Sequence, residues 1–175
     1  IPGRGTHLCL SRMKEAIKKD PQGTKYCLKM DVSKYYPSIN HEILKQKYRR
    51  KFKDPDLLWL LDEIIDSTGG DKGIPIGNYL SQYSGNFYLS QFDHWVKEVK
   101  HVKYYYRYMD DMVILSDNKD ELHRLQIEIS HVLKSKLDLK MKGNWQVFPT
   151  FVRGVDFIGY RTFGDFVLLR KSIAK

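Results

Sequence analysis

The stretch Tyr104–Ser116, YYYRYMDDMVILS, places two adjacent acids between two runs of aromatic and β-branched residues. Such runs, separated by two or three residues, predict a tight antiparallel hairpin with Asp110 and Asp111 at its tip. Like charges side by side destabilise a strand end and raise each other's pKa, so the pair needs a neutralising partner. A divalent cation such as Mg²⁺ would neutralise both acids, but Asp is also an ordinary turn residue. The hairpin alone does not decide between a metal site and a simple turn.

A third acid favours the metal site. In Tyr26–Ile39, YCLKMDVSKYYPSI, an alternating apolar run ends at Asp31 and the chain then breaks toward a helix. This pattern predicts a strand with Asp31 at its carboxyl end. If that strand pairs beside the hairpin, Asp31 faces Asp110, and three carboxylates gather at one sheet edge. Such a cluster suits two metal ions about 3.5–4 Å apart, which is the arrangement of metals that catalyses phosphoryl transfer.

The order of the motifs along the chain resembles that of reverse transcriptases. The matching segments are Asp31 with Tyr36 (motif A), Ile74–Gln82 (motif B), Tyr108–Asp111 (the YMDD form of motif C), Leu137–Lys142 (motif D) and Val155–Tyr160 (the primer-grip hairpin). YMDD alone is moderately specific, whereas the ordered set is highly specific and covers nearly the whole chain.

The resemblance implies an RNA-directed DNA polymerase that transfers a nucleotide from a dNTP to a primer 3′-hydroxyl. Asp31 and Asp110 would hold two Mg²⁺ ions, for which Mn²⁺ can substitute, with Asp111 in a supporting position. The implied partners are an RNA template, a DNA or RNA primer and dNTPs, with an accessory protein or RNA in addition.

The resemblance also implies contacts with the incoming nucleotide. The Tyr36 ring would leave no room for a 2′-hydroxyl, the group that separates RNA from DNA at a given sugar. Arg4 would clamp the triphosphate with its guanidinium fork. Lys142 would protonate the pyrophosphate leaving group, with Lys140 as a competitor. The plain alternatives are a packed aromatic ring for Tyr36 and solvated side chains for the cations.

Two further segments carry implied contacts with nucleic acid. Gly77 allows a base or sugar to approach the backbone closely, and Ile76 and Gln82 flank it at the start of the motif B helix. The primer strand would lie against the second hairpin, through Phe157, Ile158, Gly159 and Tyr160.

Motif B departs from the commonest family pattern. The chain reads Ile76-Gly77 and Ser81-Gln82 where Gln-Gly and Ser-Pro are usual. This form, with the opening Gly3–His7, is most similar to the reverse transcriptases of diversity-generating retroelements and related bacterial enzymes. The similarity implies low copying fidelity, because Ile76 offers the base pair shape but no hydrogen bond.

Length and composition limit the number of domains, the class of binding partner and the cellular compartment. With 175 residues the chain forms one domain that buries roughly 70% of its unfolded surface. Its net charge of +9 favours a polyanionic partner over a merely solvated basic surface. Cys9 and Cys27 have no CxxC spacing, which predicts buried or inert thiols in a reduced, cytoplasmic protein. No long apolar stretch predicts a membrane span, and the first residue, Ile1, indicates a chain cut from a longer one.

The predicted fold class is α+β, an antiparallel sheet with helices packed on one face. The resemblance adds the reverse-transcriptase palm with its ferredoxin-like, split βαβ core. It divides the chain into a remnant of fingers (1–25), a palm with the catalytic acids (26–150) and a primer-grip-like hairpin that leads to a missing thumb (151–175).

Apolar patterning predicts several elements outside the catalytic motifs. One long helix is expected over Tyr79–Lys100, and strands are expected over Leu137–Met141, Phe148–Thr162 and Phe166–Leu169. Gly164-Asp165 forms the expected turn between the last two strands.

Three other functions compete with a reverse transcriptase. A binding module that had lost catalysis would tolerate loss of the acids, yet all three are present. A nucleotide cyclase would place its acids in a Gly-Gly-Asp or Gly-Gly-Glu hairpin, but Gly69-Gly70-Asp71 follows a predicted helix. An RNA-templated RNA polymerase more often shows Gly-Asp-Asp where this chain has Met109-Asp110-Asp111. The sequence therefore favours the reverse transcriptase.

Overall fold

The computed structural model describes residues 5–77 and 79–170, which form two compact units. Unit 1 combines the chain up to Asp31 with Val96–Ile129 and with the chain from Lys142 onward. Unit 2 combines Val32–Trp95 with Ser130–Met141. Arg4 lies outside the described residues. The division into fingers, palm and primer-grip segments is one of function and stays a prediction.

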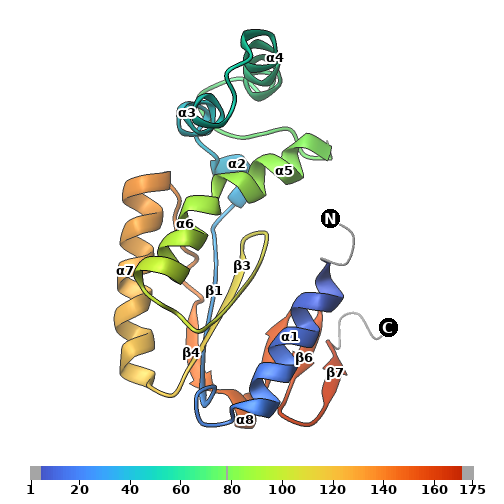
Figure 1. Cartoon of the computed structure of the whole chain (residues 1–175), viewed down its shortest axis with the longest axis vertical. Coiled ribbons are helices and arrows are strands. Elements are labelled where there is room, and N and C mark those ends of the chain that lie inside the picture. Colours follow the sequence, from blue (N-terminus) through green and yellow to red (C-terminus); the bar gives the residue numbers. More distant parts are fainter. Residues whose placement is uncertain (1–4, 78, 171–175) are drawn as a thin grey trace. The chain divides into compact units, whose positions relative to one another are not determined.

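Unit 1 is built on a four-stranded antiparallel sheet with the order β2-β3-β1-β4. The strands are β1 (Tyr26–Asp31), β2 (Tyr104–Tyr108), β3 (Asp111–Ser116) and β4 (Gln146–Pro149). Strands β2 and β3 form the predicted hairpin, and β3 pairs along β1 (Figure 1). With helices between β1 and β2, and α7 (Lys119–Leu137) between β3 and β4, the chain has the β-α-β-β-α-β order of a ferredoxin-like core. The predicted α+β class and antiparallel sheet are confirmed.

Alternate side chains of the central strands point to opposite faces of this sheet. Leu28, Met30, Met112 and Ile114 lie on one face and are at most 2% exposed. Helix α7 lies on this face, as is seen from one cavity that is lined by Leu122 of α7 together with Ile114. The position of α7 on this face is the helix-on-sheet arrangement that the sequence predicted.

The other face is also covered. There α1 (Thr6–Lys19) packs with a second, three-stranded antiparallel sheet made of β5 (Val155–Phe157), β6 (Tyr160–Thr162) and β7 (Val167–Leu169). The shared core consists of Met13, Ile17, Cys27, Val113, Leu115, Phe148, Val155 and Phe157. Cys27 is fully buried and burial raises the pKa of its thiol, so this cysteine is inert, as predicted.

Asp20, just after α1, joins that helix to the edge strand β2. Its carboxylate accepts hydrogen bonds from Lys103 Nζ (2.8 Å), the Tyr104 hydroxyl (2.7 Å) and the Gly23 N–H (2.9 Å). These donors, Lys103 first, lower the pKa of Asp20 from 3.8 to about 2. A carboxylate whose pKa is depressed in the folded state contributes stability above its unfolded pKa and loses it as the pH falls.

We therefore expect Asp20→Asn to lower the thermal midpoint at neutral pH and to flatten the loss of stability between the two pKa values of 3.8 and about 2. Thermal unfolding followed by circular dichroism across that pH range measures both effects. Asp165→Asn, in the exposed β6–β7 turn, is the matched control. An Asp20→Asn protein with the wild-type acid profile would contradict this account.

Unit 2 is helical. It contains α2 (Tyr35–Ser38), α3 (His41–Lys51), α4 (Pro55–Asp66), α5 (Tyr79–Tyr88), α6 (Ser90–His94) and the last part of α7. Asn40 Oδ1 caps α3 by accepting from the Ile43 N–H (3.1 Å), and Asp54 Oδ1 caps α4 by accepting from the Leu57 N–H (2.9 Å). Helices α3 and α4 pack against each other. None of the helices that the structure describes has the length and apolar composition needed to span a bilayer.

The prediction of one long helix over Tyr79–Lys100 was wrong. The segment forms α5, α6 and a π-helical turn, Trp95–Val99. The interruption follows Tyr88, where the Ser90 hydroxyl donates to the Phe87 carbonyl (2.7 Å). A serine that bonds locally to a main-chain carbonyl competes with the helix ladder, which explains a break that apolar periodicity does not show.

Two predicted strands also differ from the structure. Over Leu137–Met141, α7 continues to Leu137, and only Met141 makes a bridge, with Val32. The single strand predicted over Phe148–Thr162 is divided into β4, a helical turn α8 (Thr150–Arg153), β5 and β6. Pro149 precedes α8 and Gly154 follows it with φ +73°, a conformation that L side chains rarely adopt.

Candidate active site

The three acids identified in the sequence lie together at one end of the unit 1 sheet. Asp31 is the last residue of β1 and is the cross-strand partner of Asp111, the first residue of β3. Directly opposite residues project from the same face of a sheet. Asp110 lies in the turn before them, and its carboxyl group shares a hydrogen bond with that of Asp31. Asp31 therefore contacts both positions of the Asp-Asp pair rather than Asp110 alone.

The turn that carries Asp110 is held in an uncommon backbone conformation. Met109 has φ +53°, in the left-handed region that favours glycine. Arg107 Nη1 donates to the Met109 carbonyl oxygen (2.8 Å) and so restrains this residue. A two-residue connection with positive φ matches the right-handed twist of the flanking strands. The turn thus holds Asp110 against Asp31.

The acids disfavour one another's charge. Burial, a hydrogen bond with Asp31 and repulsion by Asp31 raise the pKa of Asp110 from 3.8 to about 6. Burial also raises the pKa of Asp111, although the charge of Lys29 partly opposes this. One oxygen of Asp31 and one of Asp111 are buried without a hydrogen-bond partner. Partly buried carboxylates in this state are neutralised either by a proton or by a cation.

Lys142 and Lys29 neutralise part of this charge. Lys142 Nζ lies 2.5 Å from Asp31 Oδ2, and the Lys142 N–H donates to the Asp31 carbonyl (2.8 Å). The hydrogen bond with Asp31 raises the pKa of Lys142. Of the two lysines considered for the leaving group, Lys142 is the one in contact with an acid, and Lys140 is exposed.

Lys29 was not identified from the sequence. Its Nζ lies 3.5 Å from Asp111 Oδ2 and also donates to the main-chain carbonyl of Asp156 in β5. The Asp156 carboxylate in turn accepts from Arg170 Nε (2.9 Å). Lys29 therefore connects a catalytic candidate to the β5–β6 hairpin. The only sequence signal for it is its position two residues before Asp31, on the same face of β1.

A polar cavity of about 300 Å³ adjoins the acids in unit 1. Its lining combines acids and cations: Lys29, Asp31, Asp111, Asn144, Gln146, Arg153, Asp156, Arg161 and Arg170, with Met30, Phe148 and Gly154. The mixture of charges suits the phosphates of a bound strand better than an apolar ligand.

The acids fit divalent metal in their chemistry. Within residues 5–77 and 79–170, no three His, Cys, Asp or Glu side chains are grouped so as to hold a metal ion as they stand. Lys142 occupies one oxygen of Asp31, and Lys29 approaches one oxygen of Asp111. The unpartnered oxygens of these two acids, with the protonation-prone Asp110, form an all-oxygen donor set, which is what Mg²⁺ prefers.

The hairpin that was predicted over Val155–Tyr160 is present as β5 and β6, and its contact with a primer stays a prediction. Ile158 and Gly159 connect the strands with φ +52° and +81°, as a type I′ turn requires. The Gly159 carbonyl accepts from the Arg170 N–H (2.9 Å), and Tyr160 is half-buried. The Phe157 side chain is fully buried in the unit 1 core, so its ring is not available to a ligand.

Tyr36 lies in unit 2, on α2. Its ring is half-buried against Gly85 of α5, where an added Cβ would come within 3.3 Å of Tyr36 Cε1. The neighbouring Tyr35 is 3% exposed, and its hydroxyl donates to the Gly85 carbonyl (2.5 Å). Tyr35 is thus the packing residue, as predicted, and Gly85 provides the space for both rings.

The motif B loop is joined to the same part of unit 2. The Ile74 N–H donates to the Tyr36 carbonyl (3.3 Å), and the Ser81 hydroxyl donates to the Pro75 carbonyl. Beyond these anchors the loop is open. Ile76 is 78% exposed, and Gly77 has φ +93° with no atom within 4 Å of the place that a Cβ would take. Gln82 is exposed at the start of α5.

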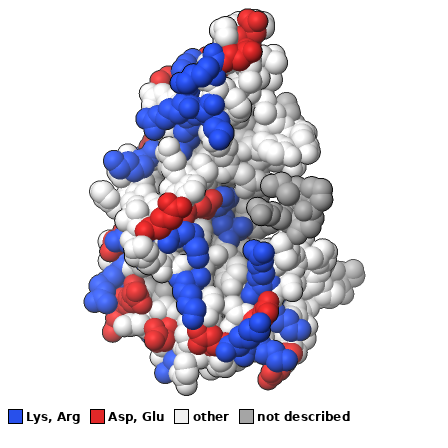
Figure 2. Space-filling model, in the orientation of Figure 1, with Lys and Arg blue, Asp and Glu red and all other residues white. Residues whose placement is uncertain are grey.

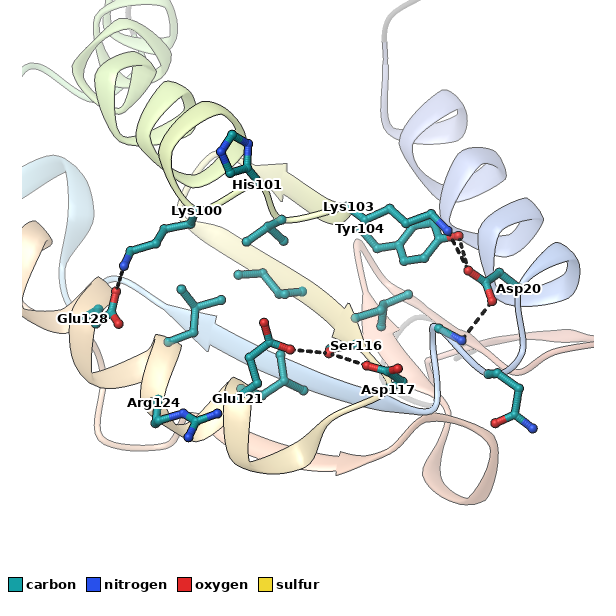
Figure 3. A pocket seen from close by; sticks show the side chains of 17 residues that line it. Asp20, Lys100, His101, Lys103, Tyr104, Ser116, Asp117, Glu121, Arg124 and Glu128 are labelled. Atoms are coloured by element: carbon teal, nitrogen blue, oxygen red, sulfur yellow. Dashed lines mark hydrogen bonds and ion pairs between the residues drawn. The ribbon is translucent and has the colours of Figure 1, made fainter.

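Another cavity of unit 1, of about 630 Å³, is lined by none of the acids, lysines or hairpin residues described above (Figure 3). It lies between the start of β2, β3 and α7. Two of its three Lys and Arg side chains are paired with carboxylates, because Lys103 pairs with Asp20 (2.8 Å) and Lys100 pairs with Glu128. These two lysines therefore already have anionic partners within the protein.

The chain matches the family described as "Reverse transcriptase (RNA-dependent DNA polymerase)" over residues 1–162. It belongs to the reverse transcriptase family. The match spans the three acids, the motif B loop and the β5–β6 hairpin, so the order of motifs in the sequence identified the family correctly.

Two curated proteins are similar to this chain in sequence. Protein YkfC of Escherichia coli (strain K12) is 22% identical over 177 aligned residues, which cover 78% of this chain and 46% of that protein. The "Uncharacterized mitochondrial protein ymf11" of Marchantia polymorpha is 28% identical over 103 residues, 58% of this chain and 13% of that protein. The chain therefore spans less than half the length of these relatives.

Solved structures support the fold. Telomerase from Candida albicans, in complex with a TWJ fragment of telomeric RNA, gives a TM-score of 0.72 at 11% identity and covers 96% of this chain and 34% of that one. Apo telomerase from Candida tropicalis gives 0.65 at 15% identity, with 92% and 35% covered. At such identities the likeness establishes the reverse-transcriptase palm fold.

Proposed function

We propose that this chain is the catalytic palm of an RNA-directed DNA polymerase, which extends a primer on an RNA template with dNTPs. The observation that carries the proposal is the convergence of Asp31, Asp110 and Asp111 at the β2–β3 hairpin tip, in a chain of the reverse transcriptase family. A mere binding surface has no use for acids placed so close together that Asp31 raises the pKa of Asp110 and of Asp111.

In this proposal Asp31 and Asp110 would hold two Mg²⁺ ions, with Asp111 in support. The chemistry that bound ions supply is a lower pKa for the primer 3′-hydroxyl and a stabilised leaving oxygen. For the ions to be held, Lys142 must release Asp31 Oδ2, which it contacts at 2.5 Å. Its ammonium is then free to face the pyrophosphate and donate a proton to it.

The remaining residues position the substrates. The Ile158–Gly159 turn and the main chain of Phe157 hold the primer strand, and the mixed-charge cavity beside them takes its phosphates. Lys29 fixes Asp111 relative to this hairpin through the Asp156 carbonyl. The template strand, the dNTP and an accessory protein or RNA complete the assembly.

Tyr36 selects the sugar of the incoming nucleotide in this proposal. Its ring is held by Gly85 and Tyr35 and has little freedom to move aside for a 2′-hydroxyl. We expect Tyr36→Ala to raise rNTP incorporation relative to dNTP by about tenfold or more, since a steric exclusion is removed. Competition assays with mixed nucleotides measure this ratio. Tyr35→Phe is the control, and an unchanged ratio in Tyr36→Ala would assign Tyr36 to packing.

The test of the proposal is primer extension by the full-length protein on an RNA template with dNTPs and Mg²⁺. Templated extension that stops when the RNA or the metal is withdrawn supports the polymerase. Salt-dependent RNA binding without any extension would replace it with a binding module that has kept the palm and lost catalysis.

A further inference from the structure

A strongly basic pocket lies in unit 2, on helices that carry none of the catalytic acids. A cavity of about 420 Å³ opens there between α3, α6 and the end of α7. Its lining includes Lys47, Arg50 and Lys136 with the rings of Phe92 and Trp95, and within the described part of the chain no Asp or Glu lines it. Figure 2 shows Lys and Arg side chains gathered over α3.

Lys47 is the unusual member of this pocket. It is only 4% exposed, and its ammonium donates to Gln91 Oε1 (2.9 Å) and lies 5.9 Å from the centre of the Tyr88 ring. No carboxylate among the described residues pairs with it. Burial, with the nearby charge of Arg50, lowers the pKa of Lys47 to about 8. Lysines are almost never buried without an anionic partner, so the structure leaves a place for an anion from outside.

The cavity in Figure 3 provides the comparison. There Lys103 and Lys100 are each paired with a carboxylate of the protein, Asp20 and Glu128. In the basic pocket, Arg50 and Lys136 have neither a hydrogen bond nor an ion pair with any described residue. Unpaired cations around a buried one make a site for an anionic ligand, whereas paired cations do not.

The aromatic rings narrow the class of anion. Phe92 and Trp95 are stacked, with ring centres 5.9 Å apart and 28° between their planes. An adjoining cavity of about 170 Å³ shares three lining residues with the first, two of them cations, and adds Lys51 and Phe87. Rings beside cations, repeated in two neighbouring cavities, are typical of proteins that bind unpaired nucleic acid strands.

We propose that these two cavities bind a single-stranded polynucleotide, with phosphates against Lys47, Arg50 and Lys136 and a base against the Trp95 ring. The repeat of ring and cation suits consecutive nucleotides of one strand better than a single free nucleotide. This site is additional to the polymerase reaction and does not depend on it.

Binding of a fluorescent oligouridylate, without primer, dNTP or divalent metal, tests the proposal in the full chain. We expect the double variant Arg50→Glu with Lys136→Glu to weaken binding about tenfold, and to reduce the slope of log K against log salt by about 0.7 for each phosphate that the variant no longer neutralises. Trp95→Leu is expected to weaken binding by a similar factor with the slope unchanged, because stacking is not ionic. If those variants unfold, Lys47→Met, which keeps the volume of the buried side chain, replaces them and is also expected to weaken oligouridylate binding.

The matched control is Lys14→Glu with Lys119→Glu, which changes the net charge equally at exposed positions outside the pocket. Equal weakening by both double variants would show a non-specific field and overturn the proposal. Displacement by uridine monophosphate as effective, per nucleotide, as by the oligomer would assign the site to a free nucleotide. Binding of phosphatidylserine vesicles with no binding of RNA would assign it to a membrane. Because no catalytic component is present, failure here leaves the polymerase proposal unaffected.

Discussion

Asp110→Asn is expected to reduce primer extension by at least about 10³-fold, because a carboxylate that binds metal supplies several kcal/mol of stabilisation to the transition state. The same change removes a charge that burial and Asp31 disfavour, since the pKa of Asp110 is raised to about 6. Activity and stability should therefore move apart: extension is lost while the thermal midpoint stays the same or rises. Single-turnover extension and thermal unfolding of one preparation measure both.

Asp117→Asn is the matched control for this experiment. Asp117 is an exposed acid that follows the same strand, β3, and lines the cavity of Figure 3 instead of the acid cluster. The same chemical change there should alter extension by less than about twofold. If Asp110→Asn lost activity and its thermal midpoint fell in parallel, Asp110 would be a structural residue of the turn. Full activity in Asp110→Asn would remove it from the metal site.

The acid cluster was readable in the sequence because each part has a local signature. A hairpin with acids at its tip, and a strand that ends in Asp31, are short-range patterns, and their pairing brings the acids to one sheet edge. The match to a family's motif order then fixed the fold. Lys29 was not identified from the sequence because its role depends on a contact with Asp156, which lies 127 residues away in the chain.

The errors have a similar origin. Apolar alternation across Phe148–Thr162 conceals the helical turn between Pro149 and Gly154, where main-chain conformation decides the structure. Lys47 belongs to a run of basic residues that reads as a solvated helix face. That one of them is buried without a carboxylate follows from how α3 and α6 pack, which the sequence does not express.

The largest effect on stability is expected from Phe157→Ala. The Phe157 ring is fully buried in the core that joins α1, the main sheet and the β5–β6 hairpin. Truncating a buried phenylalanine removes its transfer energy and leaves a cavity, so the free energy of unfolding should fall by about 3–5 kcal/mol. Urea unfolding measures this value. Phe166→Ala, at a residue that is 51% exposed, should cost less than about 1 kcal/mol.

Phe157→Leu separates packing from primer contact at the same position. A large apolar side chain refills most of the space and should cost less than about 1.5 kcal/mol. Because the wild-type ring lies in the core, we expect the Leu variant to extend primers with an unchanged KM for primer. A stable Phe157→Leu protein with a raised KM would mean that the ring itself meets the primer strand. An unchanged KM for primer would instead leave the main chain of the Ile158–Gly159 turn, with its positive φ angles, as the part of the hairpin that meets the primer.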